Sequence, residues 1–198
     1  MKKGNRWEDH FARRAKQEKW LARSVYKLQE IDRRFGVVRK GDRVLDLGCY
    51  PGSWSQYLLK AVGGQGEVVG FDLLEPVHLK APNFKFVKAD VLRIDMDWLA
   101  KHVGPRDCVL SDLAPKTTGV RISDSARSLE LAQRALGIAL ALLKGGGNFL
   151  CKVFEGEGLK EFRDSLAGHF GDARAVRPAA VRKGSREIYL LGLRFTGE

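Results

Sequence analysis

The chain has 198 residues, 44% of them hydrophobic and 30% charged, and its formal net charge is +11. This composition is typical of a globular protein, excludes an intrinsically disordered chain and makes a polyanion a candidate partner. The longest apolar run, Ile138–Leu143, is far shorter than the roughly 18 residues of a membrane-spanning helix, and the N-terminus lacks the apolar core of a secretory signal. We therefore expect a cytoplasmic protein with no membrane association.

The three cysteines, Cys49, Cys108 and Cys151, are odd in number, form no Cys-x-x-Cys pair and lie in or beside apolar runs. Buried, reduced thiols fit this pattern better than a disulfide framework or a zinc site. No metal site is expected.

The first forty residues are strongly basic, with thirteen Lys and Arg against five Asp and Glu. Trp7, Phe11 and Trp20 are interleaved with the basic residues. A solvated helical face with a frayed end would give this pattern, but we favour a basic arm that lies along RNA phosphates. The candidate RNA contacts are Arg6, Arg13, Arg14, Lys16, Lys19 and Arg23.

The helical spacing of Val25, Leu28, Ile31 and Phe35 predicts a helix over Ser24–Phe35 with one buried face. We assign residues 1–40 as a basic arm and helix that belong to the same domain as residues 41–198.

From Arg43 onward, short apolar runs alternate with longer helical segments. The predicted strands are Arg43–Leu47, Glu67–Asp72, Lys85–Lys88, Cys108–Ser111, Asn148–Val153 and Glu187–Phe195. The predicted helices are Trp54–Ala61, Met96–His102, Ser125–Lys144 and Leu159–His169, and Gly145–Gly147 is expected to form a helix-to-strand turn. This alternation predicts an α/β fold, with a mostly parallel sheet covered by helices on both faces.

The first predicted strand ends in a glycine-containing loop, a place where doubly wound sheets bind ligands. Asp46 lies within the strand and is followed by Gly48, Pro51 and Gly52, whose glycines allow close approach of a ligand. A dinucleotide fingerprint needs a third glycine, and here Pro51 occupies the loop. A plain strand-to-helix turn is the alternative interpretation.

The next two strands also end in acidic residues. Asp72 is placed to accept hydrogen bonds from ribose hydroxyls, and Asp90 to reach an adenine amino group. Each could instead cap a following helix. Together with the first strand they indicate an adenosine ligand, either NAD or S-adenosylmethionine.

Four ionisable residues are expected to meet at the same edge of the sheet. Asp112 follows the fourth predicted strand, and Lys152 lies inside the apolar fifth, where an isolated charge would be expensive. Glu187 begins the last strand and joins them if that strand is antiparallel, while Lys27 precedes the apolar Leu28 on the early helix. A snorkelling or salt-bridged Lys152 is the structural alternative.

These motifs resemble those of the FtsJ-type RNA 2′-O-methyltransferases. The matching segments are Arg23–Leu28, Asp46–Gly48, Pro51–Tyr57, Phe71–Leu74, Ser111–Pro115, Lys152–Phe154, Gly156–Gly158 and Ser185–Tyr189. The resemblance implies a Rossmann-like fold with a seven-stranded sheet, its last strand antiparallel, and S-adenosyl-L-methionine as cofactor. It implies a Lys-Asp-Lys-Glu tetrad of Lys27, Asp112, Lys152 and Glu187. The implied cofactor contacts are Gly52, Trp54, Asp72, Asp90 and Asp112, to which we add Asp46, Gly48 and Pro51.

The resemblance further implies 2′-O-methylation of a uridine in the A-loop of 23S rRNA, within the large ribosomal subunit. Lys152 would act as general base or stabilise the developing alkoxide, Asp112 would orient it, and Lys27 and Glu187 would position the ribose. A tRNA anticodon loop and an mRNA cap are alternative targets. More distant alternatives are an NAD-dependent dehydrogenase and a non-catalytic RNA-binding module. We expect a monomer without an obligate protein partner.

Overall fold

A computed structural model describes residues 6–197, with side chains from His10 onward. Its strands are β1 (Arg43–Leu47), β2 (Glu67–Asp72), β3 (Phe84–Lys88), β4 (Arg106–Ser111), β5 (Leu143–Phe154), β6 (Phe170–Val176) and β7 (Glu187–Phe195). Its helices are α1 (Arg6–Gln17), α2 (Val25–Phe35), α3 (Ser53–Val62), α4 (Met96–His102), α5 (Arg121–Leu142) and α6 (Leu159–Ala167).

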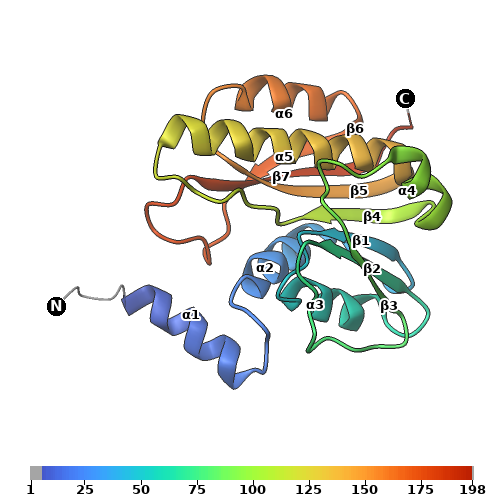
Figure 1. Ribbon diagram of the computed structural model, residues 1–198, viewed down its shortest axis with the longest axis horizontal. Helices are drawn as coiled ribbons and strands as arrows, with labels where there is room; N and C mark the ends of the chain where they lie inside the picture. Colours follow the sequence, from blue (N-terminus) through green and yellow to red (C-terminus); the bar gives the residue numbers. More distant parts are fainter. Residues whose placement is uncertain (1–5, 198) are drawn as a thin grey trace.

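The seven strands form one sheet in the order β3-β2-β1-β4-β5-β7-β6 (Figure 1). The pairs between β1, β2, β3, β4 and β5 are parallel, whereas β7 is antiparallel to both β5 and β6. The predicted α/β fold, with its mostly parallel sheet and antiparallel last strand, is confirmed. Because chain direction reverses at β7, the beginning of β7 lies beside the carboxyl ends of β4 and β5.

Helices cover both faces of the sheet. Side chains of α4, α5 and α6 share one apolar core with the sheet, and those of α2 and α3 share another. The central strands are almost completely buried because both of their faces are covered. Two buried layers thus fix the strand ends that carry the polar residues.

The largest differences between the predicted segments and the structure are at three places. The edge strand β6 was not predicted, because its sequence, Phe-Gly-Asp-Ala-Arg-Ala-Val, is buried only at its two ends and lacks an apolar run. Helix α5 begins one turn before Ser125 and ends at Leu142. Gly145–Gly147 lies inside β5, where the register with β4 shifts, so the expected helix-to-strand turn is a bulge within the strand.

The basic N-terminal segment is anchored to the rest of the molecule. Ala15 of α1 packs with Val25, Tyr26 and Ala180, and Phe11 and Trp20 border this cluster. The helix therefore presents its basic side chains from a fixed base. The three cysteines are free and buried, as expected. Among residues 6–197, no helix combines the length and apolarity needed to cross a membrane.

Candidate active site

The four ionisable residues expected to meet do so, through a tyrosine between them. Lys152 Nζ lies 3.0 Å from Asp112 Oδ1 and donates to the Asp112 backbone oxygen at 2.7 Å. Lys27 Nζ lies 2.5 Å from Glu187 Oε1. The Tyr189 hydroxyl is 2.8 Å from Asp112 Oδ1 and 2.9 Å from Glu187 Oε1. We call this line of contacts, Lys152–Asp112–Tyr189–Glu187–Lys27, the ion chain.

Strand register explains why residues far apart in sequence meet here. In the antiparallel β5–β7 pair, Lys152 lies opposite Tyr189 and Phe154 lies opposite Glu187. Residues two apart on a strand point to the same face, so all four side chains share one face of the sheet. Asp112 directly follows β4, the parallel neighbour of β5. The buried Leu28 fixes α2 so that Lys27 borders the same edge.

The ion chain carries two ammonium groups and two carboxylates, so its formal charges balance. Burial alone would raise the pKa of Asp112, but Lys152 and Lys27 outweigh burial and hold that pKa below its usual value. Burial, reinforced by Asp112 and Glu187, raises the pKa of Tyr189 well above its usual value. Tyr189 therefore keeps its single hydroxyl proton, which serves two carboxylates.

Tyr189 is the site residue that the sequence analysis did not identify. It belongs to the segment Ser185–Tyr189 that carried part of the family resemblance, but only Glu187 was singled out there. The available signal was the alternation of a strand, because a residue two positions after Glu187 must share its face. Opposite-strand pairing with Lys152 then needed the register, which only the structure supplies.

A cavity of about 290 Å³ lies at the carboxyl ends of β1, β2, β3 and β4. Its lining includes Gly48, Tyr50, Asp72, Asp90 and Asp112. We call it the strand-end cavity. It brings together four of the predicted cofactor contacts and reaches the ion chain at Asp112.

Asp72 and Asp90 also stabilise the turns that follow their strands. Asp72 accepts the backbone N–H groups of Tyr50 at 2.9 Å and Leu74 at 3.0 Å, and Asp90 accepts that of Leu92 at 3.0 Å. A carboxylate offers about four acceptor positions, so both residues can cap a turn and still bind hydroxyl or amino groups of a ligand. The helix-cap alternative is not borne out, because both residues stabilise turns and Asp95 is the N-cap of α4.

The other predicted cofactor contacts, Asp46, Pro51, Gly52 and Trp54, lie outside the lining of this cavity. Trp54 is buried, donates from Nε1 to the Ser24 carbonyl at 2.9 Å and packs 5.9 Å from the Tyr189 ring. Its packing thereby helps to fix the position of the Tyr189 ring.

Asp46 is fully buried, and its carboxylate differs from the others of the site in its hydrogen bonding and its pKa. Its Oδ2 accepts from Ser55 at 2.6 Å, whereas its Oδ1 has no hydrogen-bond partner among the described residues. Burial, with the nearby charges of Asp112 and Asp72, raises its pKa to about 7. A positively charged ligand group would relieve this accumulation of carboxylates.

A second cavity of about 290 Å³ lies at the other end of the ion chain. It is lined by Arg23, Ser24, Lys27, Phe154, Arg182, Ser185 and Glu187. We call it the acceptor cavity. The ion chain thus connects a cavity edged with carboxylates to a cavity edged with cations.

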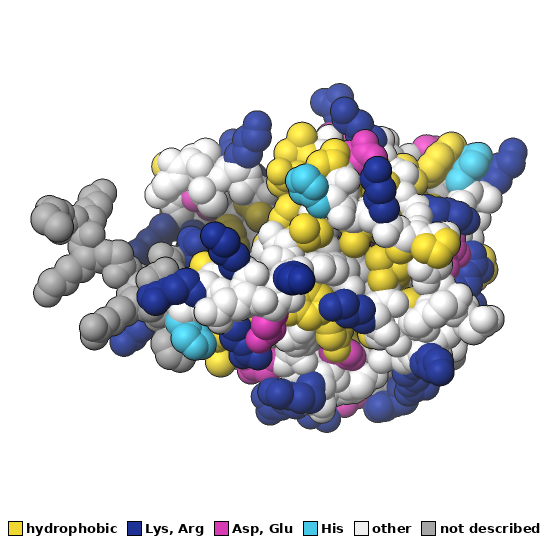
Figure 2. Space-filling view, turned by 90° about the horizontal axis from the view of Figure 1, so that it is seen from below, with side chains coloured by type: hydrophobic (Ala, Val, Ile, Leu, Met, Phe, Trp, Pro, Cys, Tyr) yellow, Lys and Arg dark blue, Asp and Glu magenta, His cyan; other side chains and the backbone are white. Residues whose placement is uncertain are grey.

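The predicted RNA contacts divide by position. Arg23 lines the acceptor cavity and donates to the Ala180 carbonyl at 2.8 Å. Arg14 pairs with Glu18 at 2.6 Å and lies over the Tyr26 ring. Arg13, Lys16 and Lys19 are exposed, and the side chain of Arg6 is outside the described part of the chain. Figure 2 shows many more basic than acidic side chains on the face it presents.

Residues 20–195 match the FtsJ-like methyltransferase family. The chain belongs to this family. That membership decides against the dehydrogenase and the non-catalytic module among the alternatives. The chain is 47% identical over 188 residues to the ribosomal RNA large subunit methyltransferase E of Bdellovibrio bacteriovorus, covering 93% of this chain and 95% of the relative. It is 45% identical to the enzyme of the same name from Desulfosudis oleivorans, covering 96% and 92%.

Solved structures agree with the fold of this FtsJ-like methyltransferase. A Plasmodium falciparum protein provisionally described as a ribosomal RNA methyltransferase is 27% identical and superimposes with a TM-score of 0.80, over 90% of this chain and 100% of the other. Fibrillarin of Aeropyrum pernix superimposes with a TM-score of 0.58 at 16% identity, over 79% and 68%. At that identity the second likeness bears on the fold alone.

Proposed function

We propose that the protein transfers a methyl group from S-adenosyl-L-methionine to the ribose 2′-oxygen of a uridine in 23S rRNA, in the large ribosomal subunit of the cytoplasm. The observation that carries this proposal is the ion chain between the two cavities. Asp112 borders the strand-end cavity, and Lys27 and Glu187 border the acceptor cavity. A methyl donor and a hydroxyl acceptor bound in these cavities would meet at Lys152.

The residues of the strand-end cavity fit S-adenosylmethionine, which supplies an electrophilic methyl group on a sulfonium. Asp72 and Asp90 have acceptor capacity left for ribose hydroxyls and the adenine amino group. Asp112 in the lining, with the charge of the buried Asp46 close to it, suits the positive charge of the methionine end. Gly48 has a φ of +80°, and a Cβ there would lie 3.0 Å from Leu113, so only glycine leaves the backbone in this position.

Lys152 is the residue placed to handle the acceptor hydroxyl. Asp112 takes two of the three N–H donors of its ammonium group, through a carboxylate and a backbone oxygen. The third is left to face the 2′-oxygen. As that oxygen bonds to the methyl carbon, the carbon–sulfur bond of the donor would break to leave a neutral thioether, and the hydroxyl proton would pass to solvent water. Lys152 compensates the negative charge that develops there. Lys27 and Glu187 bind the ribose, and Tyr189 keeps the two carboxylates apart with one proton between them.

Ribosomal RNA as the substrate is supported by the full-length relatives, which are ribosomal RNA large subunit methyltransferases at 45–47% identity. The net charge of +11 suits a polyanion. The cations of the acceptor cavity are placed for phosphates beside the reacting ribose.

The test is mass spectrometric mapping of 2′-O-methyl groups in rRNA from cells that lack this protein. We expect one uridine of 23S rRNA to lose its methyl group and the purified protein with S-adenosylmethionine to restore it on large subunits. An unchanged 23S rRNA, with a methyl group lost from tRNA or mRNA instead, would contradict the proposed substrate.

A further inference from the structure

Phe154 is an aromatic residue at the carboxyl end of β5, next to the Glu187 end of the ion chain. It lies two residues after Lys152 on β5 and opposite Glu187 of β7, on the same face as both. Its side chain is only partly buried. The ring therefore lies at the edge of the acceptor cavity, where we propose that the acceptor ribose binds.

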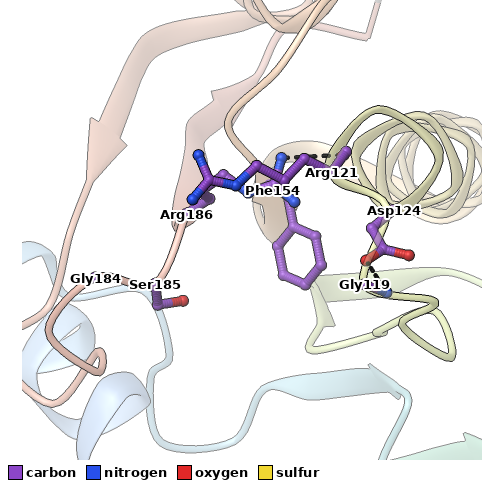
Figure 3. A pocket seen from close by; sticks show the side chains of 7 residues that line it. All are labelled: Gly119, Arg121, Asp124, Phe154, Gly184, Ser185 and Arg186. Atoms are coloured by element: carbon purple, nitrogen blue, oxygen red, sulfur yellow. Dashed lines mark hydrogen bonds between the residues drawn. The ribbon is translucent and has the colours of Figure 1, made fainter.

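A third cavity, of about 320 Å³, opens on the far side of this ring. It is lined by Gly119, Arg121, Asp124, Phe154, Gly184, Ser185 and Arg186. Phe154 and Ser185 line the acceptor cavity as well, so the two cavities are neighbours. Figure 3 shows the ring pointing into the space between Gly184–Ser185 and the loop at Gly119. The volume lies within the range of small-molecule sites, roughly 300–1,000 Å³.

The walls of this third cavity are held in place by hydrogen bonds. Arg186 Nη1 donates to Ser125 Oγ at 2.6 Å and to the Arg121 carbonyl at 3.1 Å, which holds its guanidinium 5.9 Å from the centre of the Phe154 ring. Asp124 accepts from the backbone N–H groups of Thr118 at 2.7 Å and Gly119 at 3.2 Å. The opposite wall is therefore preorganised too.

The chemistry of the lining suits an unpaired nucleotide. An exposed aromatic ring offers a stacking surface to any base, and guanidinium groups next to it offer stacking and phosphate contacts. Across the two neighbouring cavities, five basic side chains face two carboxylates: Arg23, Lys27, Arg121, Arg182 and Arg186 against Asp124 and Glu187. The excess of cations favours a ligand with phosphates.

We propose that the third cavity is a nucleobase site. The base attached to the reacting ribose leaves its helix or loop and stacks on Phe154, and the phosphates of that nucleotide lie near Arg121 and Arg186. The inference rests on the proposed function for the identity of the RNA. It adds that the enzyme acts on an unpaired nucleotide, because a base inside a duplex cannot reach this ring.

The first test measures binding without catalysis. A fluorescently labelled oligouridylate is titrated with the native protein and with Phe154→Leu, Phe154→Tyr and Trp98→Leu. Stacking on an aromatic side chain contributes enough that Phe154→Leu is expected to weaken binding about 5- to 100-fold. Phe154→Tyr keeps the ring and is expected to bind within about threefold of the native protein. Trp98→Leu removes a partly exposed aromatic residue of α4, outside the three cavities, and serves as the matched control. Equal binding by Phe154→Leu and the native protein overturns the proposal.

The second test measures methyl transfer to large ribosomal subunits. Phe154→Leu is expected to raise the KM for subunits by a similar factor and to leave the KM for S-adenosylmethionine unchanged. If Phe154→Leu does not fold, Ser185→Leu narrows the same cavity from the opposite side and is expected to give the same loss. A native protein that binds oligouridylate through Phe154 but does not methylate subunits would refute the proposed function and leave the nucleobase site standing. Methylation that is indifferent to both variants would refute the nucleobase site alone.

Discussion

Glu67, at the amino ends of the strands, and Asp46, at their carboxyl ends, are carboxylates with opposite pKa shifts. At the amino ends of the strands, Glu67 is surrounded by Lys85 at 2.9 Å and by Arg43 and Arg106 at 3.2 Å. Burial would raise the pKa of Glu67, but these three cations lower it to about 2. At the carboxyl end of β1, Asp46 forms no ion pair with any described residue, and burial raises its pKa to about 7.

This contrast separates a charge-compensated cluster from the carboxylates of the candidate site. The cations around Glu67 more than compensate its burial, so folding favours the ionised carboxylate and the cluster needs no ligand. Asp46 itself is left under-compensated close to the cavity that Asp72 and Asp112 line, at a cost in stability that a cationic ligand can offset. The following predictions test whether the two ends differ as this comparison requires.

The largest effect is expected for Lys152→Ala. We expect methyl transfer to fall by a factor of about 10³ or more, because the group that faces the 2′-oxygen is lost, while binding of S-adenosylmethionine changes little. Lys144→Ala is the matched control, since Lys144 lies near the other end of β5 and pairs with Asp107 at 2.6 Å. Single-turnover rates and calorimetric binding measure both quantities. Near-normal turnover by Lys152→Ala would remove Lys152 from the mechanism.

Asp46→Asn is expected to stabilise the ligand-free protein and to weaken S-adenosylmethionine binding. The native pKa of about 7 lies above the ordinary 3.8, so the native protein loses stability as pH rises from about 4 to about 7. Asparagine keeps an acceptor for Ser55 and does not ionise, so the variant escapes this loss, roughly 2–3 kcal/mol at pH 8.5 relative to pH 5. Urea unfolding at several pH values measures the difference. A pH-independent difference would show that Asp46 does not titrate in this range.

Glu67→Gln, in contrast to Asp46→Asn, is expected to lower the stability of the protein at neutral pH and to leave turnover unchanged. The pKa of Glu67 is lowered from 4.5 to about 2, so its stabilisation is present above about pH 4.5 and is lost as pH falls toward 2. Because Lys85 and Arg43 are well exposed, solvent screening limits the loss to about 1–2 kcal/mol at pH 7. A drop in kcat at unchanged fold would contradict a purely structural role for this end of the sheet.

Tyr189→Phe removes the proton between the two carboxylates of the ion chain while keeping the ring against Trp54. We expect kcat to fall about tenfold with little change in either KM. A donated hydrogen bond favours the ionised carboxylate, so its loss should move the acidic limb of the kcat–pH profile to higher pH. Tyr57→Phe, which removes a 2.6 Å hydrogen bond to Asp32, is the control that costs stability without moving this limb.

The sequence predicted the residues of the site better than their connections. Asp72, Asp112 and Lys152 follow or occupy apolar strands whose direction is readable, so their common edge could be predicted. The bridging role of Tyr189 depends on the β5–β7 register, and no local pattern encodes the pairing of Lys152 with Tyr189, 37 positions later in the sequence. The edge strand β6 was missed for a related reason, since half-exposed strands carry little apolar signal.

The smallest effect is expected from the basic helix α1, where Arg13, Arg14 and Lys16 are replaced together by Gln. We expect RNA affinity to fall a few-fold and the plot of log affinity against log salt to become shallower, by about 0.7 per lost phosphate contact. The loss should stay below three contacts, because Arg14 already pairs with Glu18. Replacing the exposed Lys40, Lys101 and Arg163 is the matched control of equal charge. Since none of the described residues of α1 lines the strand-end cavity or the acceptor cavity, the triple variant should change the KM for subunits and not kcat. An unchanged salt slope would mean that α1 does not contact phosphates. RNA binding would then depend on the cations of the acceptor cavity and of the third cavity.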